Sequence, residues 1–559
     1  MKNLRDYHDL YLKTDVLLLA DVFESFRVVT MNSYGLDPLH YLTAPGLSWD
    51  AMLKMTKVEL ELFTEPEQLL FIEQGIRGGV SMISNRHSKA NNAYLPDFDP
   101  EEETKYIVYL DANNLYGWSM SQPLPIRNFR FLPKDEIENF NLKNLSDYDD
   151  KGYILEVDLE YPDHLHDLHN DYPLAPEHYS VPGDMLSPAA KELLAKFNRK
   201  VPKMGQKKLI PTLLRKNKYI VHYRNLQYYL EKGMKLCGIH RILEFDQEAW
   251  LAPYINFNTE KRKLAKSSFE KDLWKLFSNS IFGKTMENMR QRKDIRIVTD
   301  PYRAKCWVAR PTFNSFKIVN EDMTIVKLDK TSVYWNRPSY AGMVILDLSK
   351  LHMYRFHYDH VLKKYGGNAK LLFTDTDSLT YELKTADVYK DMRENLDLYD
   401  TSDYPHTHFL HDSTNAKVLG KFKDECAGKP PLEFVGLRSK MYSILLSDNL
   451  TKNAVKGIKK SFVRKHIRHE QFQNCLTFGE KTKASFFSIR SFNQQLQTVR
   501  VEKDALSPFD DKRYLTSEGT DTISYGHWRI RPDVSPEEKK RLGEQSCKIG
   551  YMRSYISKS

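Results

Sequence analysis

The chain has 559 residues, of which 41% are hydrophobic and 28% are charged, and its net charge is +9. This length and composition predict a folded protein with several subdomains around more than one core, and they exclude a disordered chain. No apolar run approaches the roughly 20 residues that cross a bilayer, and the N-terminal stretch lacks a secretory signal, so we expect an intracellular protein without membrane contact.

The predicted elements mix helices and strands along the whole chain. Residues 11–27 have apolar side chains at helical spacing and predict an amphipathic helix. Residues 106–110 form a β-rich run that breaks into a polar turn at Asp111. The later expectations, in chain order, are mostly irregular structure over 130–190, a helix from about Ser187, helix over 258–290, short strands over 291–340, and a long helix that Gly366 and Gly367 end.

Cysteine spacing gives no metal or disulfide signature. Cys237, Cys306, Cys426, Cys475 and Cys547 lie far apart, with no CxxC pair. The sequence therefore predicts reduced thiols rather than a zinc ribbon or a disulfide framework.

Two aspartates, Asp375 and Asp377, stand one residue apart in the stretch KLLFTDTDSLTYEL. On a strand they share a face and repel each other, and a bound divalent cation offsets such repulsion. A polar hairpin turn is the alternative reading. Because Asp111 also ends a strand, the two β-edges are expected to bring three carboxylates together. With substrate phosphates, this set predicts two Mg²⁺ ions, or Mn²⁺ in their place, and phosphoryl transfer.

A helical stretch, KLFSNSIFG, offers ligands for those phosphates. Its spacing places one lysine, one amide, one aromatic ring and one glycine on a single face, namely Lys275, Asn279, Phe282 and Gly283. Such a face suits a nucleoside triphosphate. Just upstream, EKRK adds Lys261, Arg262 and Lys263 as further phosphate ligands. A surface helix with ordinary lysines is the alternative.

Two basic tracts are candidates for nucleic-acid contact. Residues 196–224 contain ten Lys or Arg and no acid, and residues 451–469 contain seven and no acid. Interleaved aromatic side chains make them suitable for phosphates and bases. A solvated face is the alternative for each tract.

Taken together, these segments resemble the family B DNA polymerases, and more closely their protein-primed branch of phages, linear plasmids and virus-like mobile elements. Five motifs in the family's order carry the resemblance, which is far more specific than any single match. They are IRGGV (76–80, similar to YxGG), DANNLYG (111–117, DxxSLYP), KLFSNSIFG (275–283, KxxxNSxYG), FTDTDS (373–378, YxDTDS) and KMY (440–442, KxY). In addition, YLKTD (11–15) resembles the last of three proofreading-exonuclease motifs. The sequence departs from the family at Asn114, Gly117, Phe282 and Phe373, none of which is a metal ligand.

The resemblance implies a template-directed DNA polymerase that adds deoxynucleotides to a primer 3′-OH by two-metal phosphoryl transfer during DNA replication. Its implied partners are primer-template DNA and deoxynucleoside triphosphates, with a terminal priming protein as a further candidate. The implied residues are Asp111, Asp375 and Asp377 for catalysis and metal binding; Tyr116, Lys263, Lys275, Asn279 and Phe282 for the nucleotide; Arg77, Gly78, Gly79, Lys440 and Tyr442 for primer and DNA; and Tyr11 and Asp15 as an exonuclease remnant.

The implied fold is α+β, a polymerase right hand of palm, fingers and thumb, with a truncated ribonuclease H-like exonuclease remnant at the N-terminus. The first two exonuclease motifs have no room before Tyr11, so we expect no proofreading by this chain. The expected boundaries are 1–75 (exonuclease remnant), 76–130 (palm), 131–250 (basic insertion of the protein-primed type), 251–290 (fingers), 291–345 (second insertion), 346–445 (palm), 446–530 (thumb) and 531–559 (tail).

Three rival functions stay open at this point. A metal-dependent nuclease or hydrolase would use the histidines of HLHDLH (164–169) or HTHFLHD (406–412), since imidazole clusters bind zinc. A catalytically decayed remnant that only binds DNA is the second, although the carboxylate motifs are intact. A reverse transcriptase is the third, but those enzymes usually carry adjacent aspartates, whereas Thr376 separates this pair.

Overall fold

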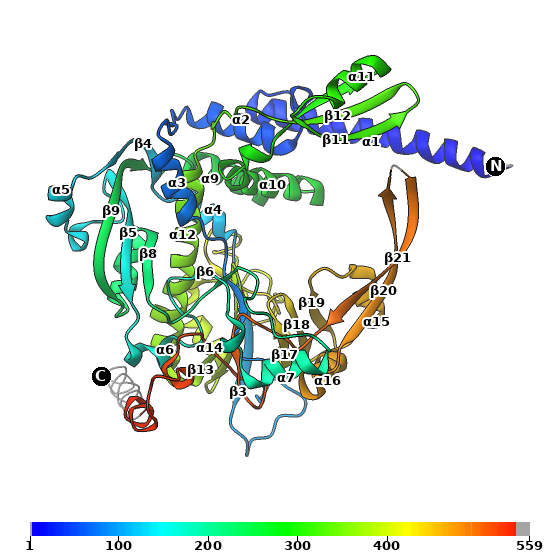
Figure 1. Cartoon of the computed structure of the whole chain (residues 1–559). Helices are drawn as coiled ribbons and strands as arrows, with labels where there is room; N and C mark the ends of the chain where they lie inside the picture. The colour runs from blue at the N-terminus through cyan, green and yellow to red at the C-terminus, as the bar shows by residue number, and fades with distance from the viewer. Residues whose placement is uncertain (1–2, 494, 544–559) are drawn as a thin grey trace.

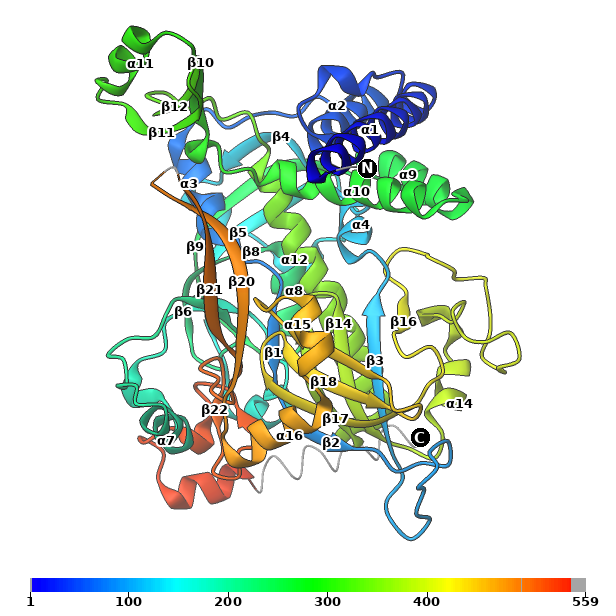
Figure 2. The same ribbon diagram turned by 90° about the vertical axis from the view of Figure 1, so that its right-hand side faces the viewer.

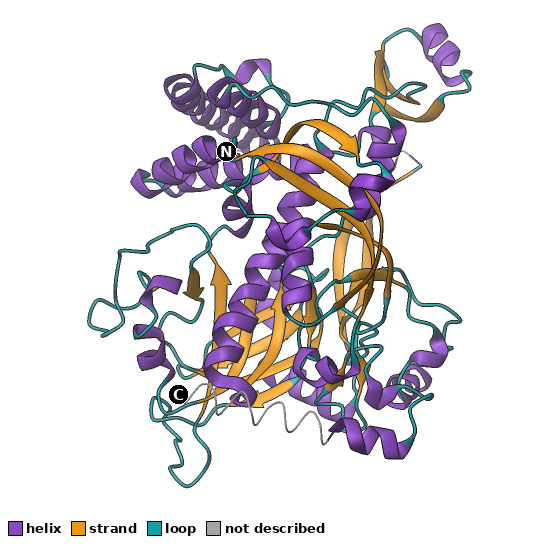
Figure 3. Ribbon diagram, turned by 90° about the vertical axis from the view of Figure 1, so that its left-hand side faces the viewer, coloured by secondary structure: helices purple, strands orange, loops and turns teal. Residues whose placement is uncertain are grey.

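The computed structural model describes residues 3–493 and 495–543 (Figure 1). A group of helices gathers at one end of the molecule, most of the sheets lie beyond it with shorter helices among them, and the helix α12 (Ser339–Arg355) runs between the two parts (Figures 1 and 3). Within the described residues, none of the helices combines the length and the apolar character that crossing a membrane requires. Cys547 lies outside the described residues, as does much of the expected tail.

A six-stranded sheet lies at the centre of the region expected to be the palm. Its order is β1-β13-β14-β3-β16-β15, and only β15 and β16 pair in parallel. The helix α12 continues into the π-helical turn η6 (Phe356–Val361), where the Phe356 ring stacks on Phe422 with centroids 3.6 Å apart. This contact seats the helix on the sheet. The strands are β1 (Ser81–Ile83), β3 (Lys105–Ala112), β13 (Ala369–Asp375), β14 (Ser378–Lys384), β15 (Tyr399–Asp400) and β16 (Phe422–Asp424).

Four helices form the end of the molecule above this sheet: α1 (Leu4–Tyr34), α2 (Ala44–Thr56), α9 (Ala252–Leu264) and α10 (Ser268–Thr285). The expected helix over 258–290 is two helices, because the Ser267 side chain caps a new start by accepting from Glu270 N. A buried polar contact joins α2 to α9: Ser48 Oγ lies 2.9 Å from the Tyr254 hydroxyl. The helix expected over 11–27 is part of α1, but its apolar side chains there are largely exposed.

A second sheet has the order β4-β9-β5-β8, and three of its strands, β5, β8 and β9, lie within the expected first insertion. The prediction of irregular structure over 130–190 is wrong for β5, a largely buried strand in the middle of this sheet. The helix expected near Ser187 is confirmed as α7 (Pro188–Lys196), with Ser187 as its capping residue. The strands are β4 (Leu124–Phe131), β5 (Lys151–Glu160), β8 (Lys216–His222) and β9 (Lys235–Glu248).

The strands expected over 291–340 form a small sheet of order β10-β12-β11 that stands apart at the helical end (Figure 2). The long hairpin β20–β21 rises from the opposite side of the molecule (Figures 1 and 2). These elements are β10 (Lys293–Val298), α11 (Pro301–Val308), β11 (Phe313–Asn320), β12 (Met323–Asp329), β20 (Thr482–Phe492) and β21 (Gln495–Leu506). A four-stranded sheet at the base of the hairpin has the order β19-β18-β17-β2, with β2 (His87–Lys89), β17 (Pro431–Arg438), β18 (Met441–Leu446) and β19 (Thr451–Val455).

The buried guanidinium of Arg86 ties the late part of the chain to the palm sheet. It donates to the carbonyls of Gly436, Leu437, Pro508 and Gly519. The stretch after the hairpin therefore returns to the edge of the palm beside β1. The remaining elements are α3 (Pro66–Gly75), α4 (Leu115–Met120), α5 (Lys134–Glu138), α6 (His166–His169), β6 (Glu177–Tyr179), β7 (Lys208–Ile210), α8 (Tyr223–Glu231), α13 (Leu362–Tyr365), α14 (Val388–Arg393), α15 (Lys460–His466), α16 (His469–Phe478), β22 (Tyr514–Leu515) and β23 (Thr522–Ile523).

Candidate active site

Strand pairing brings two of the predicted carboxylates together. In β3, Asp111 faces Ser378 of β14, the residue directly after Asp377. The amide of Ala112 donates to the Asp377 carbonyl at 2.7 Å, which fixes the end of β3 against the turn. Antiparallel pairing thus places Asp111 and Asp377 side by side where two central strands of the sheet, β3 and β14, meet the turn.

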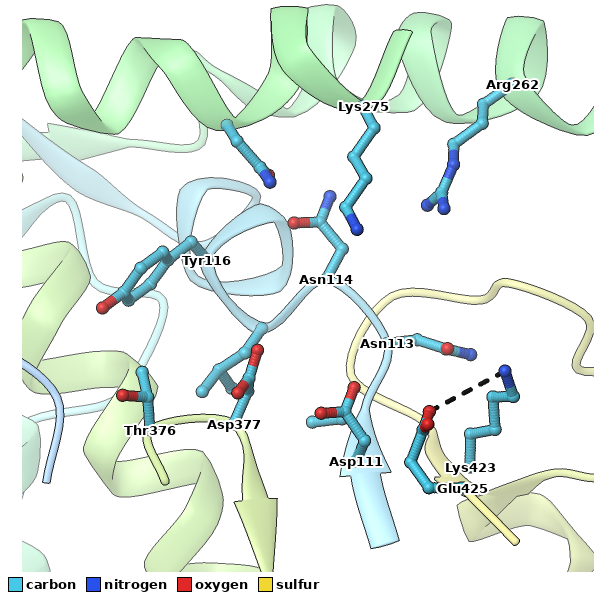
Figure 4. Close-up of a pocket in the computed structure, with 13 residues that line it drawn as sticks. Asp111, Asn113, Asn114, Tyr116, Arg262, Lys275, Thr376, Asp377, Lys423 and Glu425 are labelled. Atoms are coloured by element: carbon cyan, nitrogen blue, oxygen red, sulfur yellow. Dashed lines mark ion pairs between the residues drawn. The ribbon is translucent and has the colours of Figure 1, made fainter. Parts of the chain in front are cut away.

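Asp111 and Asp377 both project into a hollow of about 230 Å³ between the sheet and the helices α9 and α10 (Figure 4). Burial, followed by the charges of Asp377 and Glu425, raises the pKa of Asp111 to about 8. Burial and the charge of Asp375 also raise the pKa of Asp377. Nearby cations offset only part of the negative charge on these two carboxylates. Such carboxylates are typical of sites that hold metal ions or perform acid–base chemistry.

The third predicted carboxylate, Asp375, has a different neighbour. It forms an ion pair of 2.8 Å with Lys440 and lines a separate hollow of about 700 Å³, the basic hollow, which several Lys and Arg side chains border. Among the described residues, no group of three or more His, Cys, Asp or Glu side chains is arranged to hold a metal ion. Asp111 and Asp377 line the first hollow together with Glu425, and Asp375 is not among its lining residues.

Gly79 lies against the turn between the two aspartates. A Cβ at Gly79 would lie 2.4 Å from the Thr376 hydroxyl oxygen, and Thr376 itself has a left-handed backbone, φ 66°. The Thr376 amide donates to the Val80 carbonyl at 2.7 Å. Only glycine allows this close approach. By contrast, a Cβ at Gly78 would have no other atom within 4 Å.

Tyr116 stands at one wall of the hollow, on the short helix α4, and its ring stacks on Phe282 of α10. Two departures from the family pattern, Asn114 and Gly117, fit each other sterically here. The Asn114 side chain caps α4 by accepting from Gly117 N at 3.2 Å, and a Cβ at Gly117 would lie 2.3 Å from the Asn114 amide nitrogen. Asn114 thus occupies the space that a larger residue at 117 would need.

The helices α9 and α10 supply the cations of the hollow. Lys275, Asn279 and Arg262 line it, and Figure 4 shows Lys275 and Arg262 reaching down towards the carboxylates. Lys263 instead pairs with Glu260 at 2.9 Å. Both Arg262 and Lys263 are expected phosphate ligands, and Lys263 is among the residues expected to bind the nucleotide. The structure places Arg262, and not Lys263, at the hollow.

The residues expected to contact primer or DNA lie in three environments. Lys440 borders the basic hollow. Tyr442 is buried, its ring stacks on Phe373 of β13, and its hydroxyl lies 3.2 Å from that of Tyr109. Arg77 is buried: it donates to the Ile220 carbonyl at 2.7 Å and lies over the Tyr219 ring. This environment favours a structural role for Arg77.

The two residues of the expected exonuclease remnant, Tyr11 and Asp15, are exposed on α1. Neither lies at the hollow that holds Asp111 and Asp377.

Sequence reasoning missed Glu425 and Lys423, which line the hollow beside Asp111 and form an ion pair of 3.8 Å (Figure 4). The strand β16 positions both residues, because it pairs with β3 and sets Lys423 opposite Asp111. The strand has only three residues, too few for its alternation to be recognised.

The histidine motifs have structural partners. His166 and His169 are buried: His166 Nδ1 accepts from Trp528 N at 3.1 Å, and His169 bonds the Tyr161 hydroxyl at 2.6 Å. His411 bonds the Tyr404 carbonyl at 2.9 Å. These contacts give three of the six histidines in the two motifs partners within the protein.

Known proteins share features of this chain and of its fold. The family model for DNA polymerase type B, organellar and viral, matches residues 2–360. The orthorhombic crystal form of phi29 DNA polymerase has a TM-score of 0.50 and 13% identity, over 86% of this chain and 70% of that one. Phi29 DNA polymerase complexed with single-stranded DNA gives a TM-score of 0.50 and 13% identity, over 90% of this chain and 73% of that one. No curated protein matches.

The structural likeness confirms the α+β polymerase architecture, and the family match disfavours the nuclease and the decayed remnant as alternatives. The expected branch, organellar and viral, is confirmed as well. Because the family model covers more than half of the chain, this protein belongs to the organellar and viral type B DNA polymerases, and it is a DNA-directed DNA polymerase.

Proposed function

We propose that Asp111 and Asp377 hold the divalent metal ions of nucleotidyl transfer, two Mg²⁺ or Mn²⁺ ions, with Glu425 as a third carboxylate at the wall of the same hollow. Polymerases are among the enzymes that use two divalent metal ions. The donor set fits: carboxylate oxygens suit Mg²⁺, and substrate phosphates complete its coordination. Burial first, and the charges of Asp377 and Glu425 second, raise the pKa of Asp111, and a bound cation would favour its ionised form. When bound, the ions supply Lewis acidity and neutralise developing charge.

The incoming deoxynucleoside triphosphate is proposed to lie between the carboxylates and α10. Lys275 and Arg262 line the hollow and are suited to bind its phosphates. The lysine offers a compact ammonium, and the arginine offers a planar guanidinium that can donate two parallel hydrogen bonds. Asn279 lies one turn from Lys275 on the same face. The stacked Tyr116 ring is suited to be the wall against which the sugar rests.

The primer-template DNA is proposed to run along the basic hollow next to Asp375. Lys440 lines this hollow with four further cations from the second basic tract, Lys456, Lys460, Arg464 and Arg468. Their charges suit the phosphate backbone. Phi29 DNA polymerase, which has been solved with single-stranded DNA, shares the fold. That likeness supports a DNA path of this kind.

Several finer assignments are proposals on the same basis. They are replication from a terminal priming protein, an exonuclease remnant at residues 1–75 with Tyr11 and Asp15, and the domain boundaries given above. The region 507–525 packs on the palm through Arg86 and Lys512, which supports counting it with the palm rather than with the thumb.

One observation carries the proposal: Asp111 and Asp377, from two paired strands, line a single hollow with Lys275 and Arg262. Primer extension tests it, with the full chain, primer-template DNA, deoxynucleotides and Mg²⁺. We expect the wild type to extend the primer and Asp377→Asn to fail while still binding DNA in a gel-shift assay. Extension by Asp377→Asn at the wild-type rate would refute the assignment.

A further inference from the structure

A small second hollow adjoins the first on the side away from Asp377. The two share Asn113, Asn114, Arg262 and Lys275, and the second adds Lys417. Lys417 belongs to the loop between β15 and β16, so it approaches from the palm, whereas Arg262 and Lys275 come from α9 and α10. The hollow is thus lined by cations from both sides of the site.

These three cations form no direct ion pair in the part of the chain that the structure describes. Among residues 3–493 and 495–543, no ion pair involves Arg262, Lys275 or Lys417, and the Arg262 Nε atom is buried without a hydrogen-bond partner. Their neighbours in sequence are occupied: Lys263 pairs with Glu260, and Lys421 Nζ donates to the Asp397 carbonyl. Unpaired cations that converge on one hollow favour a bound anion.

The position of Lys417 relative to the paired carboxylates is fixed. Its amide donates to Asp400 at 2.8 Å, and the same carboxylate accepts from the Asn113 side chain at 2.6 Å. Asn113 follows Asp111 by two residues, so Asp400 links the loop directly to the end of β3. Burial, followed by the charges of Lys271 and Arg262, lowers the pKa of Lys417 against the opposing effect of Asp403 and Asp400.

We propose that Lys417 binds the β- and γ-phosphates of the incoming nucleotide and then the pyrophosphate that leaves. This inference rests on the proposed function. In that reaction the primer 3′-oxygen bonds to the α-phosphorus, the bond from that phosphorus to the bridging oxygen breaks, and pyrophosphate departs with the electron pair. The hydroxyl proton passes to water. With the α-phosphate at Asp111 and Asp377, the remaining phosphates extend towards Arg262, Lys275 and Lys417.

Inorganic pyrophosphate is the probe for this role. Lys417→Met is compared with Lys417→Arg, which keeps the charge, and with Lys421→Met, a lysine on the same loop outside the hollow. Three quantities are measured on the full chain with primer-template DNA: product inhibition by pyrophosphate, the rate of pyrophosphorolysis, and pyrophosphate binding by calorimetry. We expect Lys417→Met to weaken pyrophosphate inhibition and binding about tenfold, the effect of losing one charge-assisted hydrogen bond.

Lys417→Arg should retain most of the affinity, and Lys421→Met should match the wild type. The affinity for primer-template DNA should not change in any of them. Wild-type pyrophosphate affinity in Lys417→Met, or an equal loss in Lys421→Met, would overturn the inference and leave the proposed function intact. A wild type that fails to extend a primer would overturn the proposed function, while calorimetry would still decide whether Lys417 binds pyrophosphate.

Discussion

The ring of Phe282 stacks on the ring of Tyr116, with centroids 4.6 Å apart and planes inclined by 27°. Phe282 belongs to α10, the helix that carries Lys275, and Tyr116 belongs to α4, which follows Asp111. A stacked aromatic pair contributes roughly 0.5–1.5 kcal/mol beyond its buried area. The contact therefore holds the Tyr116 ring as a rigid wall at the junction of the two regions.

Replacing Tyr116 by valine should relax the choice of sugar. Without the ring, the wall of the nucleotide hollow opens, so we expect ribonucleotide incorporation to rise relative to deoxynucleotide, with total activity reduced but present. Incorporation rates for both nucleotides, measured beside the melting temperature, check this. Tyr116→Phe keeps the ring and should keep the wild-type preference. A folded, active Tyr116→Val with unchanged sugar preference would remove Tyr116 from the site.

The two aspartates of the hairpin should differ in their roles. We expect Asp377→Asn to lower the incorporation rate on the order of 10²–10³-fold, as for loss of a group that stabilises charge in the transition state. Asp375→Asn instead releases Lys440 from its ion pair. A half-exposed pair contributes at most ~1 kcal/mol, so the change should be smaller and should appear in primer-template affinity. Single-turnover kinetics and DNA titrations separate the two effects, and equal losses of rate would contradict this division.

Asp111→Asn should stabilise the metal-free protein at alkaline pH. The pKa of Asp111 is raised to about 8, so between its ordinary value and pH 8 the folded state keeps a proton that the unfolded chain has lost. The free energy of unfolding therefore falls as pH rises through that range. Asparagine avoids this cost.

Calorimetry in EDTA should accordingly show a higher melting temperature for Asp111→Asn at pH 8 and a smaller difference at pH 5. Asp97→Asn, at an exposed carboxylate, is the control and should match the wild type at both pH values. A melting temperature for Asp111→Asn that is not higher at pH 8 would argue against the buried charge at this position.

Gly79→Ala should distort the turn that carries Asp377. The new Cβ meets the Thr376 side chain at 2.4 Å, and the left-handed backbone of Thr376 leaves little room for adjustment. Overpacking of this kind costs roughly 1–3 kcal/mol, so we expect a lower melting temperature and a lower incorporation rate. Gly78→Ala meets no atom and should melt like the wild type. Equal melting temperatures for the two variants would contradict the close contact.

The proximity of Asp111 and Asp377 can be predicted from the sequence, because strand ends and motif spacing are local signals. The two residues meet through the pairing of β3 with β14, as expected from two β-edges. The partner of Asp375 was not predictable, since Lys440 comes from a distant turn and no periodicity links the two. Spacing within one helix does not determine which cation of EKRK lines the hollow, because the phase of α9 relative to α10 depends on packing; the structure places Arg262 there and not Lys263.

The buried hydrogen bonds of Arg86 have a consequence for the synthesis of the chain. Its guanidinium bonds a carbonyl at Gly519, 433 residues further along. At ~5–20 residues per second, roughly 20–90 s separate the translation of these two residues. A buried guanidinium without partners is costly, so we expect this edge of the palm to stay open on the ribosome until the late segment emerges. Assembly of the catalytic sheet would then be one of the last events in the maturation of the nascent protein.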